Sequence, residues 1–148
     1  MSKTKKKAGI LITIAIRYFT KSKKGNTKKL ADVVSAALNI EAKDVSVDLP
    51  ETVDRLILIN AMYAANIDPE VKAFLQRNKD RIGEVVNMNT SATGKSTLPV
   101  VKAAAQAAGI AVSAREFHCA ASWIFINKGL PSDEDFARAA AFARETAE

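Results

Sequence analysis

Short apolar runs rich in β-branched residues alternate along this chain with stretches whose apolar residues recur at helical spacing. The apolar runs predict strands at residues 10–16, 44–48, 56–59, 82–88 and 110–114. Helical spacing with capping residues predicts helices at residues 28–38, 68–75, 97–108 and 132–143. Strands that alternate with helices require a parallel sheet with helices on both faces, so the expected fold class is α/β. The link at residues 48–54 is too short for a full crossover helix, so a single turn or a degenerate crossover is expected there.

Length, charge and cysteine content limit the class of protein. We expect one domain at residues 8–148, preceded by a Lys-rich disordered leader at residues 1–7. The formal net charge is +6, but four of the lysines lie in that leader, which argues against a basic nucleic-acid-binding face. No run approaches the roughly 20 apolar residues of a membrane span, and no signal-peptide pattern is present. The single Cys119 excludes an internal disulfide, and these features together predict a cytoplasmic protein without a membrane partner.

The stretch between the first predicted strand and the first predicted helix has the composition of a phosphate-binding loop. It contains the hydroxyls of Thr20, Ser22 and Thr27, with Gly25 and Asn26 just before the helix. Backbone N–H groups at a helix N-terminus have no intrahelical partner, and the helix dipole favours an anion there. Glycine tolerates positive φ, so the backbone can close around a dianion. The sequence therefore predicts that the chain holds a phosphate group after its first strand.

Three loops are expected at one edge of the sheet, because ligands of open parallel sheets bind outside the carboxyl ends of the strands. They are residues 20–27, 60–66 and 89–95. In these loops and the strands before them the chain resembles the flavodoxin family, and the resemblance covers nearly all of it from residue 10 onward. It is carried by Tyr18-Phe19-Thr20 with Gly25-Asn26-Thr27, by residues 54–63, by residues 89–94, and by residues 117–123 followed by Pro131 and Asp135.

The resemblance implies a flavodoxin-like three-layer sandwich, in which a five-stranded parallel sheet of order 2-1-3-4-5 carries helices on both faces. It also implies noncovalent FMN, with the phosphate in the first loop and the isoalloxazine between the second and third loops. The cofactor-binding residues that it implies are Thr20, Ser22, Gly25, Asn26, Thr27, Asn60, Ala61, Met62, Tyr63, Asn89, Thr90, Ser91 and Gly94. The expected function is electron transfer or minimal flavin-dependent reduction, and an electron carrier is favoured over a substrate-specific oxidoreductase. The expected partner is a redox protein or a small-molecule electron acceptor.

Two departures from the family's pattern leave alternatives open. Lys23 and Lys24 lengthen the first loop, and the second loop has Ala61 where the family often has glycine. Both features favour a flavodoxin-like fold that no longer binds flavin and acts as an interaction or regulatory module. A third alternative is a basic module that binds nucleotides or nucleic acid through the lysines of residues 21–29.

Other chemistries are disfavoured by the residues themselves. Residues 94–97 imitate the end of a Walker loop, but that motif needs a glycine at position 89, where Asn89 stands. A phospho-receiver needs a carboxylate at the end of its third strand, where Asn60 is expected. His118 and Cys119 are neighbours on an extended segment and point to opposite sides, so they do not form a catalytic pair. With one His and one Cys, no metal-ligand spacing is present.

Overall fold

The computed structural model describes residues 3–7, 10–21, 25–123 and 126–148. Its strands are β1 (Lys3–Lys7), β2 (Ile10–Tyr18), β3 (Ala42–Asp44), β4 (Val53–Ala61), β5 (Ile82–Ser91) and β6 (Ala111–Ala120). Its helices are α1 (Asn26–Leu38), α2 (Pro69–Arg77), α3 (Leu98–Ala107) and α4 (Asp133–Thr146), with the short 3-10 helix η1 (Lys79–Arg81) before β5.

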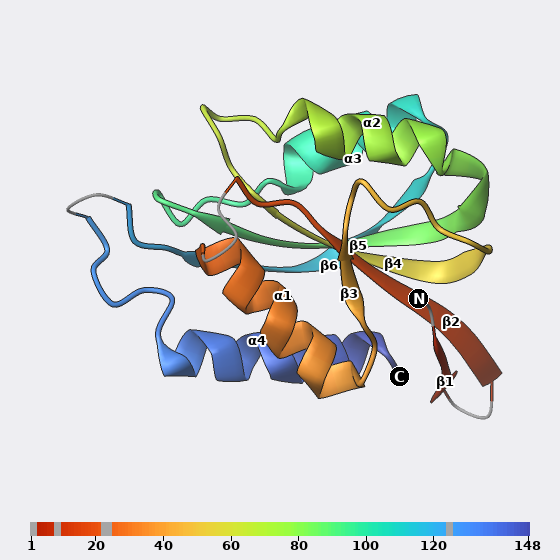
Figure 1. Cartoon of the computed structure of the whole chain (residues 1–148), viewed down its shortest axis with the longest axis horizontal. Helices are drawn as coiled ribbons and strands as arrows, with labels where there is room; N and C mark the ends of the chain where they lie inside the picture. Colours follow the sequence, from red (N-terminus) through yellow and green to blue (C-terminus); the bar gives the residue numbers. More distant parts are fainter. Residues whose placement is uncertain (1–2, 8–9, 22–24, 124–125) are drawn as a thin grey trace.

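A parallel sheet with helices on both faces forms the centre of the molecule (Figure 1). The parallel strands are arranged β3-β2-β4-β5-β6, which is the order 2-1-3-4-5 when only these strands are counted. Helices α1 and α4 pack together on one face, and α2 and α3 on the other. The predicted fold class and strand order are therefore confirmed.

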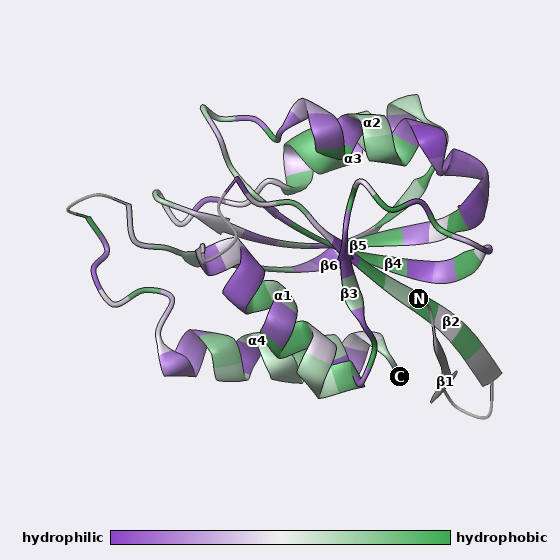
Figure 2. Cartoon of the chain, in the orientation of Figure 1, coloured by the Kyte–Doolittle hydropathy of each residue, from purple (hydrophilic) through white to green (hydrophobic). Residues whose placement is uncertain are grey.

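Two apolar cores fill the space between these layers. The core under α1 and α4 includes Ile16 and Leu30, and the core under α2 and α3 includes Leu58 and Phe74. Figure 2 shows hydrophobic residues concentrated along the central strands, whereas the helices carry both hydrophobic and hydrophilic residues. This distribution is expected of strands buried on both faces and helices buried on one.

The lysine-rich N-terminal segment differs from the expected disordered leader. Residues Lys3–Lys7 form β1, which pairs antiparallel with residues 10–14 of β2. Strand β3 pairs with Ile16, Arg17 and Tyr18 of β2, on the edge opposite β4. Because β3 is only three residues long, it leaves the first part of this edge of β2 open, and β1 pairs there.

Strand β3 lies at Ala42–Asp44, and the prediction of a strand at residues 44–48 is wrong. The chain turns after Asp44, whose side chain accepts a hydrogen bond from the Ser46 N–H at 2.9 Å and whose carbonyl accepts one from the Val47 N–H at 2.9 Å. Val45 is buried, whereas the side chain of Val47 is 42% exposed. An aspartate that caps its own turn overrides the alternating apolar pattern here.

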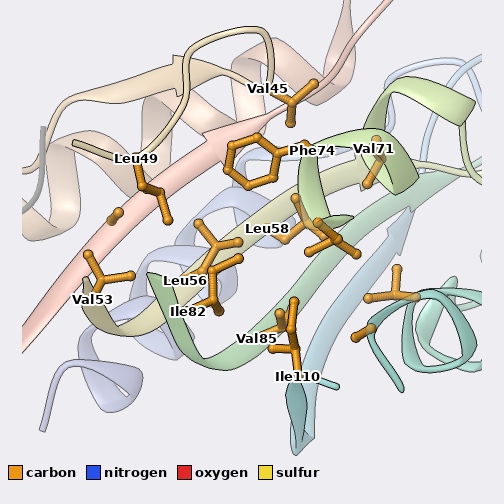
Figure 3. Packing of buried hydrophobic residues seen from close by; sticks show 14 of the residues in the cluster. Val45, Leu49, Val53, Leu56, Leu58, Val71, Phe74, Ile82, Val85 and Ile110 are labelled. Carbon is orange, nitrogen blue, oxygen red and sulfur yellow. The ribbon is translucent and has the colours of Figure 1, made fainter. Parts of the chain in front are cut away.

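The connection from β3 to β4 crosses β2 without a helix. Over the described residues 45–52 the chain forms turns and bends, and Val45 and Leu49 pack into the core beside Phe74 (Figure 3). This is the degenerate crossover that the short link predicted. Two apolar side chains thus occupy the position where a crossover helix would otherwise cover this part of the sheet.

Arg17 supports this crossover from inside the sheet. The sequence places Arg17 at the end of the first strand, but β2 continues through it, and its side chain is fully buried. Arg17 Nε donates to the Val47 carbonyl at 2.8 Å, and Nη2 donates to the Asp48 carbonyl at 3.2 Å. Burial lowers the pKa of the Arg17 guanidinium, and the carboxylates of Asp48 and Glu41 oppose that change. The buried cation therefore satisfies loop carbonyls that lack helical partners.

Candidate functional site

A cavity of about 620 Å³ opens at the carboxyl ends of the parallel strands. Its walls come from four loops, which contribute residues 20–21 and 25–27, 61–64, 90–92, and 121–123. These loops lie on one side of the molecule, at the left in Figure 1. A cavity at this edge is where a parallel α/β sheet binds ligands.

Most of the residues predicted to bind a cofactor line this cavity. They are Thr20, Gly25, Asn26, Thr27, Ala61, Met62, Tyr63, Thr90 and Ser91. Ser22 lies outside the described residues, as do Lys23 and Lys24 of the expected insertion. Asn60, Asn89 and Gly94 are not among the lining residues.

Asn60 and Asn89 belong instead to a buried polar network at the start of α3. Asn60 Nδ2 donates to Asn87 Oδ1 at 2.7 Å, and Thr97 Oγ1 donates to Asn60 Oδ1 at 2.7 Å. Asn89 Oδ1 accepts from the Thr97 backbone N–H at 3.0 Å, and Asn89 Nδ2 donates to the Lys95 carbonyl at 3.0 Å. The network holds the third loop against the start of α3. These two asparagines therefore position the cavity wall and do not line the cavity.

The first helix begins beside the cavity, and among the described residues no side chain caps its N-terminal N–H groups. Gly25 is the N-cap of α1, and the first turn contains no acid. In contrast, Asp68 caps α2 by accepting from the Glu70 N–H at 2.9 Å, and Ser132 forms a capping box on α4. The first turn of α1 therefore presents unsatisfied donors and the positive end of the helix dipole to the cavity.

Side-chain hydrogen bonds join α1 to the neighbouring loops. The hydroxyls of Thr27 and Thr90 lie 2.9 Å apart, and both side chains are buried. Asn26 Nδ2 donates to Ser122 Oγ at 3.1 Å. The start of α1 is thus tied both to the end of β5 and to the loop after β6.

The second loop is a two-residue turn in left-handed backbone. Tyr63 and Asn66 pair through reciprocal backbone hydrogen bonds of 2.7 and 2.9 Å, and the central residues Ala64 and Ala65 have φ of 50° and 62°. Positive φ at both central residues is the type I′ pattern, which favours Asn and Gly and strains alanine. The turn holds the Tyr63 backbone at the cavity without the glycine common in such turns.

Tyr63 is the aromatic residue that the second loop contributes to the cavity. Lys21 Nζ lies 4.2 Å from the centroid of its ring, and the Lys21 backbone N–H donates to Tyr63 Oη at 3.4 Å. The ring of Phe19 meets it edge-on, with 6.5 Å between centroids. Burial raises the pKa of the Tyr63 phenol, so this group is neutral at neutral pH.

Six lining residues were missed by the sequence prediction: Lys21, Ala64, Ala92, Ala121, Ser122 and Trp123. Three of them lie in the loop after β6, whose strand continues to Ala120 and not to residue 114 as expected. The side chain of Trp123 is 61% exposed, and its backbone pairs with that of Ile126. The rule that placed the other three loops at this edge also applies to the loop after the last strand, once that strand's end is known.

His118 and Cys119 lie in different environments. His118 is exposed, and its Nδ1 lies 2.8 Å from the carbonyl of Gly94, to which it donates. Cys119 is 7% exposed, and burial raises the pKa of its thiol to about 11. Among the described residues, no group of three or more His, Cys, Asp and Glu side chains could hold a metal ion. None of the described helices has the length and apolar content that crossing a membrane requires.

The arrangement of strands and helices is a flavodoxin-like fold, with a cavity at the carboxyl edge of its sheet. The structure is similar to a flavodoxin from the domain Archaea, with a TM-score of 0.70 and 12% identity over 90% of this chain and 95% of the other. It is also similar to a flavodoxin of Streptococcus pneumoniae TIGR4, with a TM-score of 0.62 and 19% identity over 90% of this chain and 97% of the other.

A third similar structure is an NAD(P)H:quinone oxidoreductase from Methanothermobacter marburgensis, with a TM-score of 0.62 and 11% identity over 91% of this chain and 96% of the other. No family model matches the sequence, and no curated protein matches it. The comparisons therefore establish the fold.

Proposed function

We propose that this protein binds FMN in the cavity at the carboxyl ends of the strands and carries electrons. The observation that carries the proposal is a single cavity of about 620 Å³ that joins the uncapped start of α1 to the aromatic side chains of Tyr63 and Trp123. This volume falls within the range of about 300–1,000 Å³ that small-molecule sites have. A ligand with a phosphate at one end and a flat ring at the other matches that arrangement. The similar flavodoxin structures support the same ligand class.

The first turn of α1 would hold the phosphate. The backbone N–H groups of Asn26 and Thr27 point out of the helix start, and the hydroxyls of Thr20 and Thr27 stand in the same wall. The Lys21 ammonium group, 4.2 Å from the centroid of the Tyr63 ring, adds a positive charge to the cavity. A dianionic phosphate would satisfy donors that no side chain of the described residues caps, and it would offset the lysines at this helix end.

The loops after β4 and β6 would hold the ring. Tyr63 and Trp123 offer aromatic faces, while Ala61, Met62 and Ala92 supply apolar wall. When bound, FMN supplies the reversible acceptance of electrons, and the protein orients the ring and excludes water from it. Trp123 is largely exposed, so this wall reaches solvent where an electron donor or acceptor can approach.

The proposal is tested by purifying the protein, recording its flavin absorbance, and titrating FMN into the apo form. We expect saturable binding in the micromolar range or tighter, and reversible bleaching of the bound flavin by dithionite. A protein that folds but binds no FMN at micromolar concentrations would overturn the proposal. That result would favour the flavodoxin-like fold that acts as an interaction module without flavin.

A further inference from the structure

The loops around the cavity carry an excess of positive charge. Four loops join the carboxyl ends of the strands to the helices, at residues 19–25, 62–68, 92–97 and 121–132. Together they contain five lysines and a single acid, Asp68, which is engaged as the cap of α2. The lysines in the described part of these loops are all exposed; they are Lys21, Lys95 and Lys128.

The first turns of the neighbouring helices leave this charge in place. On α1 the first turn contains no acid, and Lys29 in the same turn is exposed. Three acids open α4, and two of them, Glu134 and Asp135, ion-pair with Arg138. The edge of the molecule where the cavity opens is therefore positively charged.

Exposed apolar side chains lie at the same edge. The side chains of Trp123 and Ile126 are 61% and 46% exposed, and they are two of the three large apolar side chains that are exposed among the described residues. Their backbones pair reciprocally at 3.1 and 3.0 Å. Because directly opposed residues of an antiparallel pair share a face, Ile126 lies beside Trp123, which lines the cavity. Apolar side chains at a ligand site, rimmed by charged groups, favour a contact with another molecule.

We propose that these four loops form the docking surface for a redox protein whose own electron-transfer site is surrounded by carboxylates. This inference rests on the proposed flavin function and names the chemistry of the partner. Complementary charge steers the encounter and orients the small, weak complexes that electron-transfer proteins form. The excess of lysine favours an acidic partner over a basic one. It also disfavours a second copy of this chain, because two positive surfaces repel each other.

The salt dependence of electron transfer tests the proposal. The FMN-loaded protein is reduced with dithionite, freed of excess reductant, and mixed with the soluble domain of cytochrome b5, which has an acidic haem edge, or with cytochrome c, which has a basic one. Each haem iron takes one electron, so two are reduced for each reduced FMN that is reoxidised, and the protons of the flavin pass to water.

We expect the rate with cytochrome b5 to fall about tenfold between about 0.01 M and 0.15 M salt, because salt screens the attraction. The rate with cytochrome c should rise over the same range. A cytochrome b5 rate that does not fall, or a cytochrome c rate that falls, would overturn the inference while the flavin function stands. A protein that takes up no FMN would remove the proposed function, and this inference with it.

Two exposed lysines provide a matched pair of variants. Lys95 lies in the loop after β5 and does not line the cavity, whereas Lys79 lies in η1, before β5 and at the other edge of the sheet. Lys95→Glu should lower the low-salt rate with cytochrome b5 about fivefold and leave the FMN affinity unchanged. Lys79→Glu makes the same change in net charge and should lower the rate less than about twofold. Equal losses would show that net charge steers the partner and would overturn the docking surface.

A lipid surface is the competing occupant, since lysines and exposed apolar side chains also suit an anionic membrane. Sedimentation with vesicles of phosphatidylserine and phosphatidylcholine in equal parts separates the two. We expect the protein to stay in the supernatant at about 0.15 M salt, where the attraction of lysines to the vesicle surface is screened. Cosedimentation that Ile126→Ser abolishes would assign the surface to lipid and overturn the proposal.

Discussion

The hydroxyl groups of Thr27 and Thr90 lie 2.9 Å apart and join the first turn of α1 to the carboxyl end of β5. Both residues line the cavity at the carboxyl ends of the strands, yet Thr27 is only 4% exposed and Thr90 only 3%. A buried hydroxyl pair of this kind is sensitive to shape and to loss of either partner. It links the proposed phosphate-binding helix start to the strand behind it.

Replacing Thr27 with Leu should weaken FMN binding by about tenfold or more, because a bulkier side chain enters the cavity wall and a hydroxyl is lost. Fluorescence titration of the apo variant measures the effect. Thr52→Leu is the control, since Thr52 is exposed just before β4 and does not line the cavity. Equal affinities of the two variants would show that the start of α1 is not the phosphate site.

The left-handed turn after Tyr63 predicts an unusual gain of stability. Replacing Ala65 with Gly should raise the free energy of unfolding by about 1 kcal/mol, because glycine relieves the strain of a positive φ. Urea denaturation measures the change. The same substitution at the exposed Ala103, inside α3, should instead lower the free energy by about 1 kcal/mol. A loss of stability at both positions would contradict the strained turn.

The buried guanidinium of Arg17 predicts that its replacement lowers the stability of the protein. Arg17→Met removes the donors to the carbonyls of Val47 and Asp48, and it should lower the free energy of unfolding by about 2 kcal/mol. Arg138→Met removes ion pairs from a largely exposed arginine to Glu134 and Asp135, so it should cost less than about 1 kcal/mol. An Arg17 variant as stable as wild type would show that the hydrogen bonds from Arg17 do not stabilise the crossover.

Much of the fold follows from the sequence, because the central strands are buried on both faces and read as continuous apolar runs. The sequence predicts that the last strand ends at residue 114, but β6 continues to Ala120. The added part includes the polar residues Arg115, Glu116 and His118, and β6 is the edge strand of the sheet. Polar side chains are tolerated there, so the apolar signal that marks a central strand is lost. Because the predicted strand ends too early, the sequence does not place the loop with Trp123 at the edge where the cavity lies.

The candidate site was predicted at the level of loops and less well at the level of side chains. The order of strands places three loops at one edge, and nine of the thirteen predicted residues line the cavity there. Asn60 and Asn89 turn away into a network with Asn87 and Thr97. Which side of a strand end faces a cavity depends on how the next helix packs, and a sequence pattern does not contain that information.

The environment of Cys119 predicts slow reaction with thiol reagents. The thiolate is the reactive form, and burial raises the pKa of this thiol to about 11. At pH 8 iodoacetamide should modify the folded protein far more slowly than the urea-unfolded protein, and the rate should rise with pH toward 11. The free energy of unfolding should also fall as the pH rises above about 9, because the Cys119 thiol loses its proton at a lower pH in the unfolded state than in the folded state. Equally fast labelling of folded and unfolded protein would contradict a buried thiol.

The central claim is that the start of α1 holds the phosphate of a bound flavin. Parallel titrations of the apo protein with FMN and with riboflavin, which lacks the phosphate, test it most directly. We predict that FMN binds in the micromolar range or tighter and riboflavin about tenfold or more weakly, since charge-assisted hydrogen bonds are lost with the phosphate. Equal affinity for the two flavins, or binding of neither, would contradict the account.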